Sequence, residues 1–359
     1  MSPADVGAPL EALGHGARLL ADAPADWATV LVGARRVPAC YTRALLGYQA
    51  RYVRDAVDAY EDRSVVLYHD GRPAAVWPLS LARRGDVWAV GSQEASVRLP
   101  LFAATVPERT QKKMSASCLE FVQQTARALS APCFKLTEPC TGDPLGPLHR
   151  GAVELGAAIQ VRHGLYVDLR LDLADIRARI RERYRSLINR ASSLWNVDVV
   201  EGAAPEVFEE FRLLHLAVAG RATRSLATWE LQRDALATGD AFLVTLRDPS
   251  GRLVGGGLFH LSRTDGLYAV GAYDRSLFDA PVSHAVQWKA IETMKRRGLL
   301  WYFIGLRPYP RDEPAPTPKE LQLGHFKEGF ATHVYPELEL TISLGEPRPE
   351  QPSGDGEHR

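Results

Sequence analysis

A run of arginines between residues 176 and 190 is the densest group of side chains that could bind phosphate. It holds six arginines and one acid, Glu182, for a net charge of +5. Arginines four residues apart share one face of a helix, and here these are Arg177, Arg181 and Arg185. Such a face can bind the phosphates of tRNA or of a phosphorylated acceptor. The alternative is a solvated face that pairs with acids elsewhere.

Two further arginines stand in a loop rich in Ser and Thr. Arg221 and Arg224 follow Gly220, a residue type that ends helices such as the one predicted for residues 205–219. Guanidinium groups so close together can hold a carboxylate or a phosphate, and Trp229 follows them as a further substrate-binding candidate. The alternative is that both arginines cap helix carbonyls or pair with neighbouring acids.

A lysine between aromatic residues is the third candidate. Lys327 belongs to the string Phe326-Lys327-Glu328-Gly329-Phe330, between a predicted short helix and the last strand. A lysine there can bind a substrate phosphate or stabilise an oxyanion, and a packed side chain with its ammonium in water is the alternative. The loop over residues 305–318 precedes it and carries Arg307, and Lys319 follows that loop. Loops after strands of an open α/β sheet often bind ligands.

The elements that must position these residues occur twice along the chain. In the first half, the turn Asp70-Gly71 joins two predicted strands and a helix follows over residues 111–129. The second half reads as a strand, helices over residues 173–194 and 205–219, and antiparallel strands over residues 241–247, 253–261 and 267–273. A helix over residues 282–297, a strand, a short helix and a last strand follow. We therefore expect an α/β protein with two similar domains, each a mixed, partly antiparallel sheet flanked by helices.

Length and composition agree with two domains. The chain has 359 residues, of which 46% are hydrophobic. Lys plus Arg and Asp plus Glu both number 43, so no net charge attracts nucleic acid to the whole molecule. We expect a loosely held start, a divergent first half, a second half and a disordered tail, over residues 1–40, 41–163, 164–344 and 345–359.

Other patterns bear on location and metal binding. The start of the chain has no basic segment followed by an apolar run, and no stretch is long and apolar enough for a membrane span. The four cysteines form no CxxC pair, and no paired metal ligands stand out. We expect a cytoplasmic protein with reduced cysteines and no metal site.

Several stretches of the second half resemble the Fem-type family, which builds peptidoglycan interpeptide bridges from aminoacyl-tRNA, and related GNAT-like acyltransferases. The resemblance covers about residues 164–343. The string around Lys327 is its most specific part, although Ala331 stands where the family usually has Gly. The other matching stretches are residues 183–189, 214–225, 283–291, 298–305 and 319–320.

The resemblance implies a tandem GNAT-like fold and the formation of an amide bond. In the family the lysine of this string contacts phosphates of the acceptor, so Lys327 becomes a catalytic candidate. Tyr273 and His284 lie at the end of the third antiparallel strand and at the start of the next helix, where a side chain could take a proton. We expect Arg221 and Lys327 to face one cleft and to hold a negatively charged acceptor.

Two classes of acyl donor, aminoacyl-tRNA and acyl-CoA, are compatible with this fold. Acetyltransferases that use CoA bind its pyrophosphate with a glycine-containing loop before the helix that follows the third central strand. Residues 274–284 occupy that place and contain no glycine. This favours aminoacyl-tRNA over acyl-CoA, with no tightly bound cofactor. The acceptor would be a small amine, such as a cell-wall, surface-sugar or natural-product precursor. A non-catalytic RNA- or anion-binding module is the alternative from another class.

Overall fold

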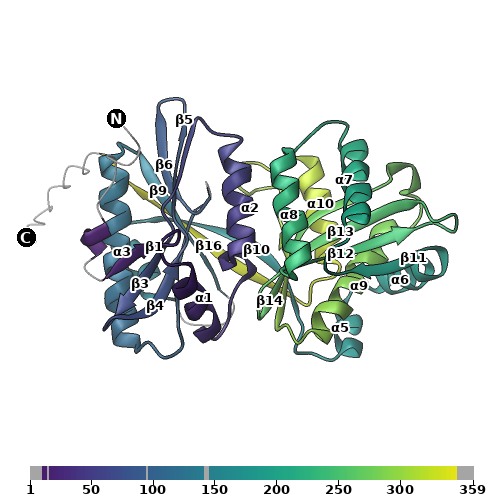
Figure 1. The fold of residues 1–359 in the computed structure, drawn as a ribbon, viewed down its shortest axis with the longest axis horizontal. Helices are drawn as coiled ribbons and strands as arrows, with labels where there is room; N and C mark the ends of the chain where they lie inside the picture. Colours follow the sequence, from purple (N-terminus) through teal and green to yellow (C-terminus); the bar gives the residue numbers. More distant parts are fainter. Residues whose placement is uncertain (1–9, 14–15, 94–95, 141–144, 346–359) are drawn as a thin grey trace, which may run out of the picture.

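The computed structural model describes residues 10–13, 16–93, 96–140 and 145–345. Two α/β halves lie side by side along the long axis of the molecule (Figure 1). A nine-stranded sheet runs through both halves in the order β11-β12-β13-β14-β15-β10-β16-β9-β7. Two smaller sheets, β1-β3-β4-β8 and β2-β5-β6, belong to the first half.

The second half is built on four antiparallel strands and a fifth that runs parallel to its neighbour. They are β11 (Asn196–Val200), β12 (Ala241–Arg247), β13 (Leu253–Leu261), β14 (Asp265–Tyr273) and β15 (Trp301–Leu306). β14 and β15 pair only from Asp265–Trp301 to Leu267–Phe303. Beyond these pairs no backbone pairing joins the two strands, and we call the region between them the gap.

Helices cover both faces of this half. On one face, α7 (Pro205–Ala219) and α8 (Leu226–Thr238) pack on β12, β13 and β14. On the other, α9 (Val282–Arg296) packs on the same strands, together with α5 (Leu173–Arg179) and α6 (Glu182–Leu194). The predicted order of elements is confirmed, and the structure adds β11 and α8 to it.

The basic run forms two helices, whereas a single helix over residues 173–194 was expected. Extended backbone at Ile180 and Arg181 separates α5 from α6. The Arg181 amide donates a hydrogen bond to the Gly329 carbonyl, 2.9 Å away, and Ile180 is buried in the core. This tertiary contact replaces the helical hydrogen bond that a continuous helix would make there.

The first half repeats the scheme with shorter strands. Its strands are β1 (Ala17–Leu19), β2 (Ala59–Asp62), β3 (Val65–His69), β4 (Arg72–Trp77), β5 (Ser80–Arg84), β6 (Val87–Gly91), β7 (Val97–Arg98), β8 (Leu101–Phe102) and β9 (Cys133–Pro139). Its α-helices are α1 (Pro24–Gly33), α2 (Arg43–Arg54), α3 (Glu108–Ala128) and α4 (Pro147–Glu154). The predicted turn joins β3 to β4, with positive φ at Asp70 and Gly71.

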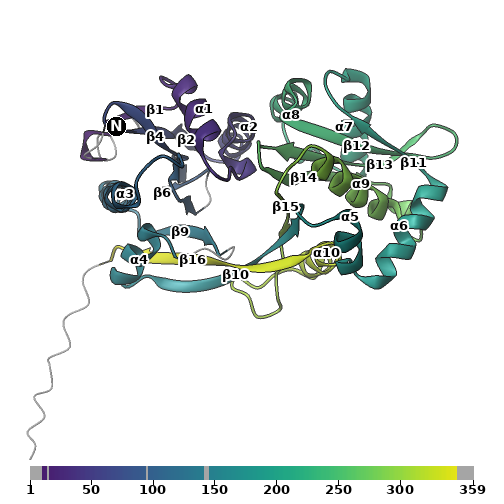
Figure 2. The ribbon, with the colours of Figure 1, turned by 90° about the horizontal axis from the view of Figure 1, so that it is seen from below.

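Two long antiparallel strands join the halves. β10 (Ala158–Asp168) and β16 (His333–Ser343) pair along most of their length and run beneath both halves (Figure 2). β10 pairs with β15 at its carboxyl end, and β16 pairs with β9 at its own. Each half therefore completes its sheet with a strand end from the other. The expected boundary between residues 163 and 164 falls inside β10.

The described part of the amino-terminal segment is ordered, where a loosely held start was expected. Trp27 of α1 is fully buried in the first core, and its indole nitrogen donates to the Tyr41 carbonyl at 2.9 Å. One large aromatic side chain thus anchors a segment whose small residues suggested little structure. Apart from Gly345, the expected tail lies outside the described residues. No helix of the described chain could cross a membrane.

Candidate functional site

The gap between β14 and β15 is lined by polar side chains from three elements. Tyr268 and Tyr273 come from β14, Gln287 from α9 and Tyr302 from β15. The Tyr302 hydroxyl donates to Gln287 Oε1 at 2.6 Å, and the hydroxyl oxygens of Tyr268 and Tyr273 lie 3.4 Å apart. Gln287 Nε2 is buried and has no hydrogen-bond partner among the described residues. Within the described chain this cluster therefore keeps one buried amide donor, Gln287 Nε2, without an acceptor.

Lys327 reaches the same gap from α10 (Pro318–Glu328). Its Nζ lies 5.6 Å from the centre of the Tyr268 ring. A Cβ at position 305 would come within 2.7 Å of Nζ, so the side chain depends on Gly305 for its room. No hydrogen bond or ion pair to Nζ is found among residues that the structure describes, and burial lowers the pKa of Lys327. An ammonium without a counter-ion is thus available to an anionic group.

The protonation states at the gap favour donation over proton abstraction by the tyrosines. Burial raises the pKa of Tyr268, and burial with the neighbouring Tyr268 raises the pKa of Tyr273 further. Both phenols are protonated at neutral pH and can donate to an oxyanion. Tyr273, which we expected as a candidate proton acceptor, is therefore better suited to donate.

His284 lies in an aromatic cluster formed by the string around Lys327 and by α6. Its ring is 4.6 Å from the Tyr184 ring, 5.3 Å from Phe326 and 5.9 Å from Phe330, centre to centre. Burial and the nearby Arg183 lower the pKa of His284 to about 4, so the imidazole is neutral at neutral pH. Both ring nitrogens are without hydrogen-bond partners among the described residues. A neutral imidazole can accept a proton.

Glu328 forms ion pairs with two of the predicted basic residues next to the gap. Its carboxylate accepts from Arg307 Nε at 3.1 Å and lies 3.7 Å from Arg181 Nη2. The proline-rich loop and the basic run are thus both attached to the residue that follows Lys327. Lys319 is exposed at the start of α10 and lies apart from this cluster.

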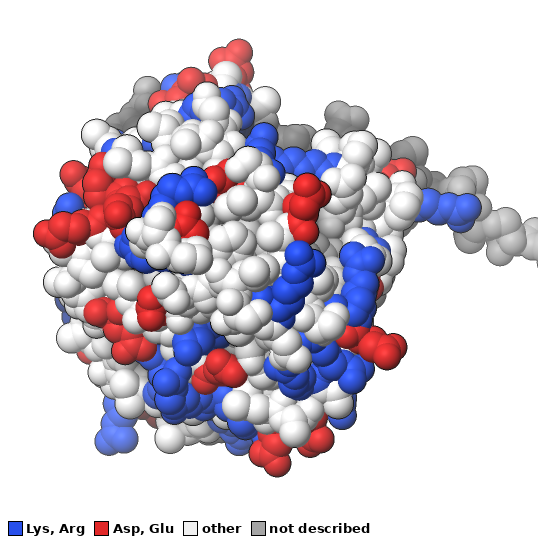
Figure 3. Space-filling model, turned by 90° about the vertical axis from the view of Figure 1, so that its right-hand side faces the viewer, with Lys and Arg blue, Asp and Glu red and all other residues white. Residues whose placement is uncertain are grey.

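Three other arginines of the basic run, together with the acid Glu182, form part of a hollow on α5 and α6. Arg177 donates to Asn189 and stacks over the Trp288 ring at 5.1 Å, and Arg185 donates to the Ala178 carbonyl at 3.4 Å. With Arg183 they line a hollow of 630 Å³. Figure 3 shows this side of the molecule, where Lys and Arg side chains gather over the lower part with acids between them.

Arg224 and Trp229 lie in the contact between the halves. Arg224 Nε donates to the Tyr48 hydroxyl of α2 at 2.9 Å, and its guanidinium lies 5.5 Å from the buried Trp229 ring. Arg221 is exposed in the connection between α7 and α8, the helices on the face opposite α9. Arg224 and Trp229 therefore help to join α8 to α2, and Arg221 approaches the sheet from a different side than Lys327.

The segment before α9 uses its own backbone donors. Asp274 accepts from the Ser276 amide at 3.0 Å and caps the short 3-10 helix over Arg275–Leu277. The amides of Leu277, Phe278, Ala280 and Val282 all donate to carbonyls within the segment. Few of its N–H groups remain for a pyrophosphate.

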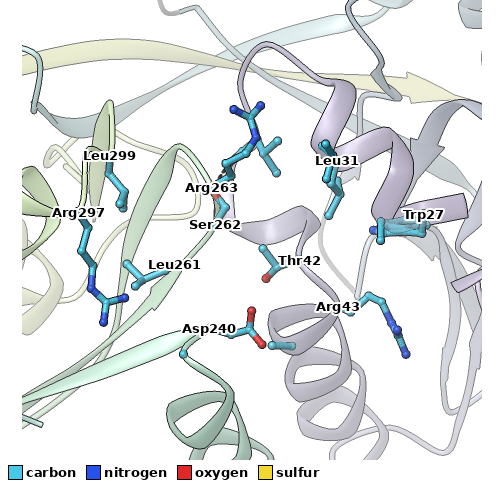
Figure 4. Close-up of a pocket in the computed structure, with 15 residues that line it drawn as sticks. Trp27, Leu31, Thr42, Arg43, Asp240, Leu261, Ser262, Arg263, Arg297 and Leu299 are labelled. Atoms are coloured by element: carbon cyan, nitrogen blue, oxygen red, sulfur yellow. Dashed lines mark hydrogen bonds between the residues drawn. The ribbon is translucent and has the colours of Figure 1, made fainter. Parts of the chain in front are cut away.

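A larger hollow lies at the opposite end of β14 from Tyr273. It has a volume of 760 Å³ and separates α1 and α2 from the turn between β13 and β14. Figure 4 shows Trp27 and Leu31 on one side and Leu261, Arg297 and Leu299 on the other. Because β14 rises about 3.3 Å per residue, this hollow is distinct from the gap that holds Lys327.

Sequence reasoning missed Tyr268, Gln287, Tyr302 and Glu328. Gln287 gave a usable signal, since it is a polar residue on the buried face of a helix with apolar positions every four residues. The tyrosines gave none, because their strands read as ordinary buried strands. Among the described residues no cluster of His, Cys, Asp and Glu could hold a metal ion.

Comparisons with known proteins place the fold. No protein-family model matches the chain, and no curated protein matches it in sequence. The crystal structure of FemX is similar with a TM-score of 0.61 and 14% identity, covering 82% of this chain and 91% of FemX. L-PGS from Bacillus licheniformis gives a TM-score of 0.57 and 12% identity, covering 88% of this chain and 91% of L-PGS.

A third similar structure is the C-terminal domain (DUF2156) of a putative lysylphosphatidylglycerol synthetase from Agrobacterium fabrum. Its TM-score is 0.57 at 12% identity, and the match covers 89% of this chain and 92% of that domain. Identities this low show the fold alone. The predicted fold is confirmed: the chain has the tandem GNAT-like α/β fold that it shares with FemX and the lysylphosphatidylglycerol synthetases.

Proposed function

We propose that this protein is an N-acyltransferase that moves an aminoacyl group from aminoacyl-tRNA to the amine of a small acceptor. The observation that carries the proposal is the Lys327 ammonium, which has no counter-ion in the described chain and lies over the ring of Tyr268, whose hydroxyl is close to that of Tyr273. A positive charge and two neutral donors in one neighbourhood suit an oxyanion that forms during the reaction. The fold shared with FemX supports the same reaction class.

The chemistry needs little beyond placement and charge stabilisation. The acceptor amine attacks the carbonyl carbon of the aminoacyl ester, and the electron pair of the C=O bond moves to oxygen. Lys327 and the phenols stabilise this oxyanion, a kind of contact worth about 2.7–4 kcal/mol per donor. Its collapse breaks the bond to the ribose oxygen, which takes a proton, while the amine nitrogen loses one. Neutral His284, directly or through water, is the candidate acceptor of that proton.

Two observations favour tRNA over CoA as the carrier of the acyl group. The segment before α9 uses most of its amides internally, so it makes a poor cradle for the pyrophosphate of CoA. The hollow lined by Arg177, Arg183 and Arg185 offers guanidinium groups to a phosphate backbone. Arg181 links the basic run to Glu328, next to Lys327, so a bound tRNA would lie close to the gap.

The test is a purified transfer assay with total tRNA charged with labelled amino acids and a panel of small amines, phosphorylated amines included. We expect labelled amide product that disappears after RNase treatment and is not restored by acetyl-CoA or longer acyl-CoAs. Product formed from acyl-CoA without tRNA would contradict the donor. Salt-dependent tRNA binding with no product from any amine would favour an RNA-binding module instead.

A further inference from the structure

A second group of charged side chains lies on the other face of the sheet, between the two halves. Arg98 of β7 pairs in register with Thr137, and Thr137 pairs with Glu339 of β16. Residues in register share a face, as do residues two apart on a strand, so Glu337 faces the same way. Tyr166 of β10 joins them, since its hydroxyl donates to Glu337 Oε1 at 3.0 Å. We call Arg98, Glu337 and Tyr166 the Arg98–Glu337 cluster.

The guanidinium of Arg98 has no bonded partner among the described residues. Its Nε is enclosed by protein without an acceptor, and no carboxylate lies within ion-pair distance. Its pKa is raised by four neighbouring groups, which are Cys40, Tyr41, Tyr166 and Glu337. Burial raises the pKa of Cys40, Tyr41 and Tyr166, so these three are neutral. Of these four groups, Glu337 is therefore the one that can carry a negative charge near Arg98.

Glu337 also lacks an ionic partner in the described chain. Burial raises its pKa, and the hydrogen bond that its carboxylate accepts within the described chain comes from the Tyr166 phenol. The contrast with Glu339, two residues along the same face, is informative. Glu339 accepts from Lys135 Nζ at 2.9 Å and from Ser96 at 3.2 Å. On this strand Glu339 is thus bonded to a lysine, whereas Glu337 lies near enough to Arg98 to feel its charge but forms no bond to it.

Opposite charges that are largely buried and kept apart are costly unless something bridges them. Arg98 and Glu337 are both half-buried, so neither residue is sealed from solvent. A solute that bridges them needs an anionic end for the guanidinium and a cationic end for the carboxylate. We propose that the Arg98–Glu337 cluster binds an α-amino acid as its zwitterion, with the carboxylate on Arg98 and the ammonium on Glu337.

The surroundings favour an amino acid with an apolar side chain. The Tyr166 ring lies 5.7 Å from the Tyr335 ring and 6.1 Å from the Trp301 ring. Arg36, bonded to Asp265, already lies over Tyr166 at 5.8 Å and over Trp301 at 5.3 Å. The cation–π position on these rings is therefore occupied, and an apolar side chain packs against them better than a second cation.

The cluster is separate from the gap that holds Lys327. Leu267 of β14 packs toward Ala39, Leu45 and Tyr48, on the face that carries Tyr166 and Glu337. Tyr302 faces α9 on the opposite side of the sheet. The proposal therefore does not rest on the proposed transferase reaction, and either can fail without the other.

The experiment uses the full chain, thermal unfolding and calorimetric titration. The probes are L-phenylalanine, L-phenylalaninamide and 3-phenylpropanoate, each at about 10 mM for the unfolding measurements. We expect L-phenylalanine to raise the Tm, and each probe lacking one charge to bind about tenfold to a hundredfold more weakly. Arg98→Met and Glu337→Gln should abolish the shift. Glu339→Gln is the matched control and should keep it.

Arg98→Met should also leave the Tm of the free protein unchanged or raise it, because it removes an unpaired charge. If that variant fails to fold, the isosteric Glu337→Gln carries the test alone. No Tm shift with any of the twenty L-amino acids would overturn the proposal. So would unchanged binding in Arg98→Met, or equal binding of 3-phenylpropanoate, which would make the cluster a site for anions only.

Discussion

A half-buried ammonium without a counter-ion weakens a fold, and among the residues that the structure describes Lys327 has none. Proteins keep costly charges of this kind mainly where function needs them. The neighbouring Gly305, at φ 139°, gives the side chain its room because a Cβ there would meet Nζ. The proposed transfer reaction therefore depends on the charge of Lys327.

Removal of that charge at constant bulk should separate function from stability. We expect Lys327→Met to lower kcat/KM for transfer about tenfold to a hundredfold, with an unchanged or higher Tm. Lys113→Met, an exposed lysine on α3 of the other half, is the matched control and should change neither. A rise in the acceptor KM alone, at constant kcat, would assign Lys327 to an acceptor phosphate and not to the oxyanion.

The pH dependence should report the same group. Burial lowers the pKa of Lys327, so its ammonium is lost at a lower pH than that of an exposed lysine. Activity should therefore fall as pH rises through that lowered pKa. Lys327→Arg, whose guanidinium stays protonated, should move the alkaline limb of the kcat/KM profile to higher pH. Identical alkaline limbs in the two proteins would show that another group controls it.

At the element scale, the string around Lys327 fixes the position of α6. The Gly329 carbonyl accepts from the Arg181 amide, and a Cβ at position 329 would come within 2.2 Å of the Tyr184 ring. Phe326 and Phe330 pack on that same ring and on His284. The glycine of the string is thus explained by packing between α10 and α6, and the lysine by the gap.

A methyl group added at position 329 should disturb the packing between α10 and α6. We expect Gly329→Ala to lower the Tm by several degrees, because Tyr184 must move and its place in the core is lost. Gly47→Ala is the matched control within α2, where a Cβ meets nothing within 4 Å, and it should raise the Tm slightly. Equal Tm values for Gly329→Ala and the parent protein would refute the packing role.

The hollow on α5 and α6 makes a separate prediction about tRNA. Each of Arg177→Gln and Arg185→Gln should weaken tRNA binding and lower the slope of log K against log salt by about 1. Filter binding at a series of salt concentrations measures both. Arg109→Gln on α3 serves as the control for a general loss of charge. Unchanged slopes in both variants would leave the hollow without a role in RNA binding.

The limits of several elements in the second half could be predicted from sequence, because nearby residues determine them. α7, β12 and β13 begin and end as predicted, since Gly220 at φ 70° and the turns at residues 248–251 mark their limits. The break between α5 and α6 could not be predicted. It depends on a hydrogen bond between Arg181 and Gly329, which are far apart in the chain. The site shows the same limit: Lys327 was found through its sequence motif, whereas Tyr268 and Tyr302, which come from other elements, were not.

At the scale of the whole molecule, β10 and β16 make the two halves one structure. Contacts across the chain add to them. Arg36 donates to Asp265 at 2.8 Å, and the Val37 amide donates to Thr264 at 2.8 Å. Arg224 joins Tyr48 across the same contact. No local pattern reveals a pairing between residues more than 170 positions apart, which is why Arg224 was expected at a substrate and not between the halves.

The buried ion pair between the halves should show strong coupling. Asp265→Asn removes the buried carboxylate to which Arg36 is bonded and should destabilise the protein by about 3–5 kcal/mol. Arg36→Met combined with Asp265→Asn should restore much of that loss. Chemical unfolding of the two single variants and the double variant gives the coupling energy. Additive single effects would show that the pair does not hold the halves together.

The central claim is that acyl transfer takes place in the gap between β14 and β15. The most direct test is a crystal structure with an aminoacyl-adenosine analogue whose ester is replaced by a stable amide. The account predicts that the amide carbonyl lies within hydrogen-bond reach of Lys327 Nζ or of the Tyr268 and Tyr273 phenols, with the adenosine directed toward α5 and α6. An analogue bound in the hollow between α1 and the β13–β14 turn, or on the opposite face of the sheet, would contradict it.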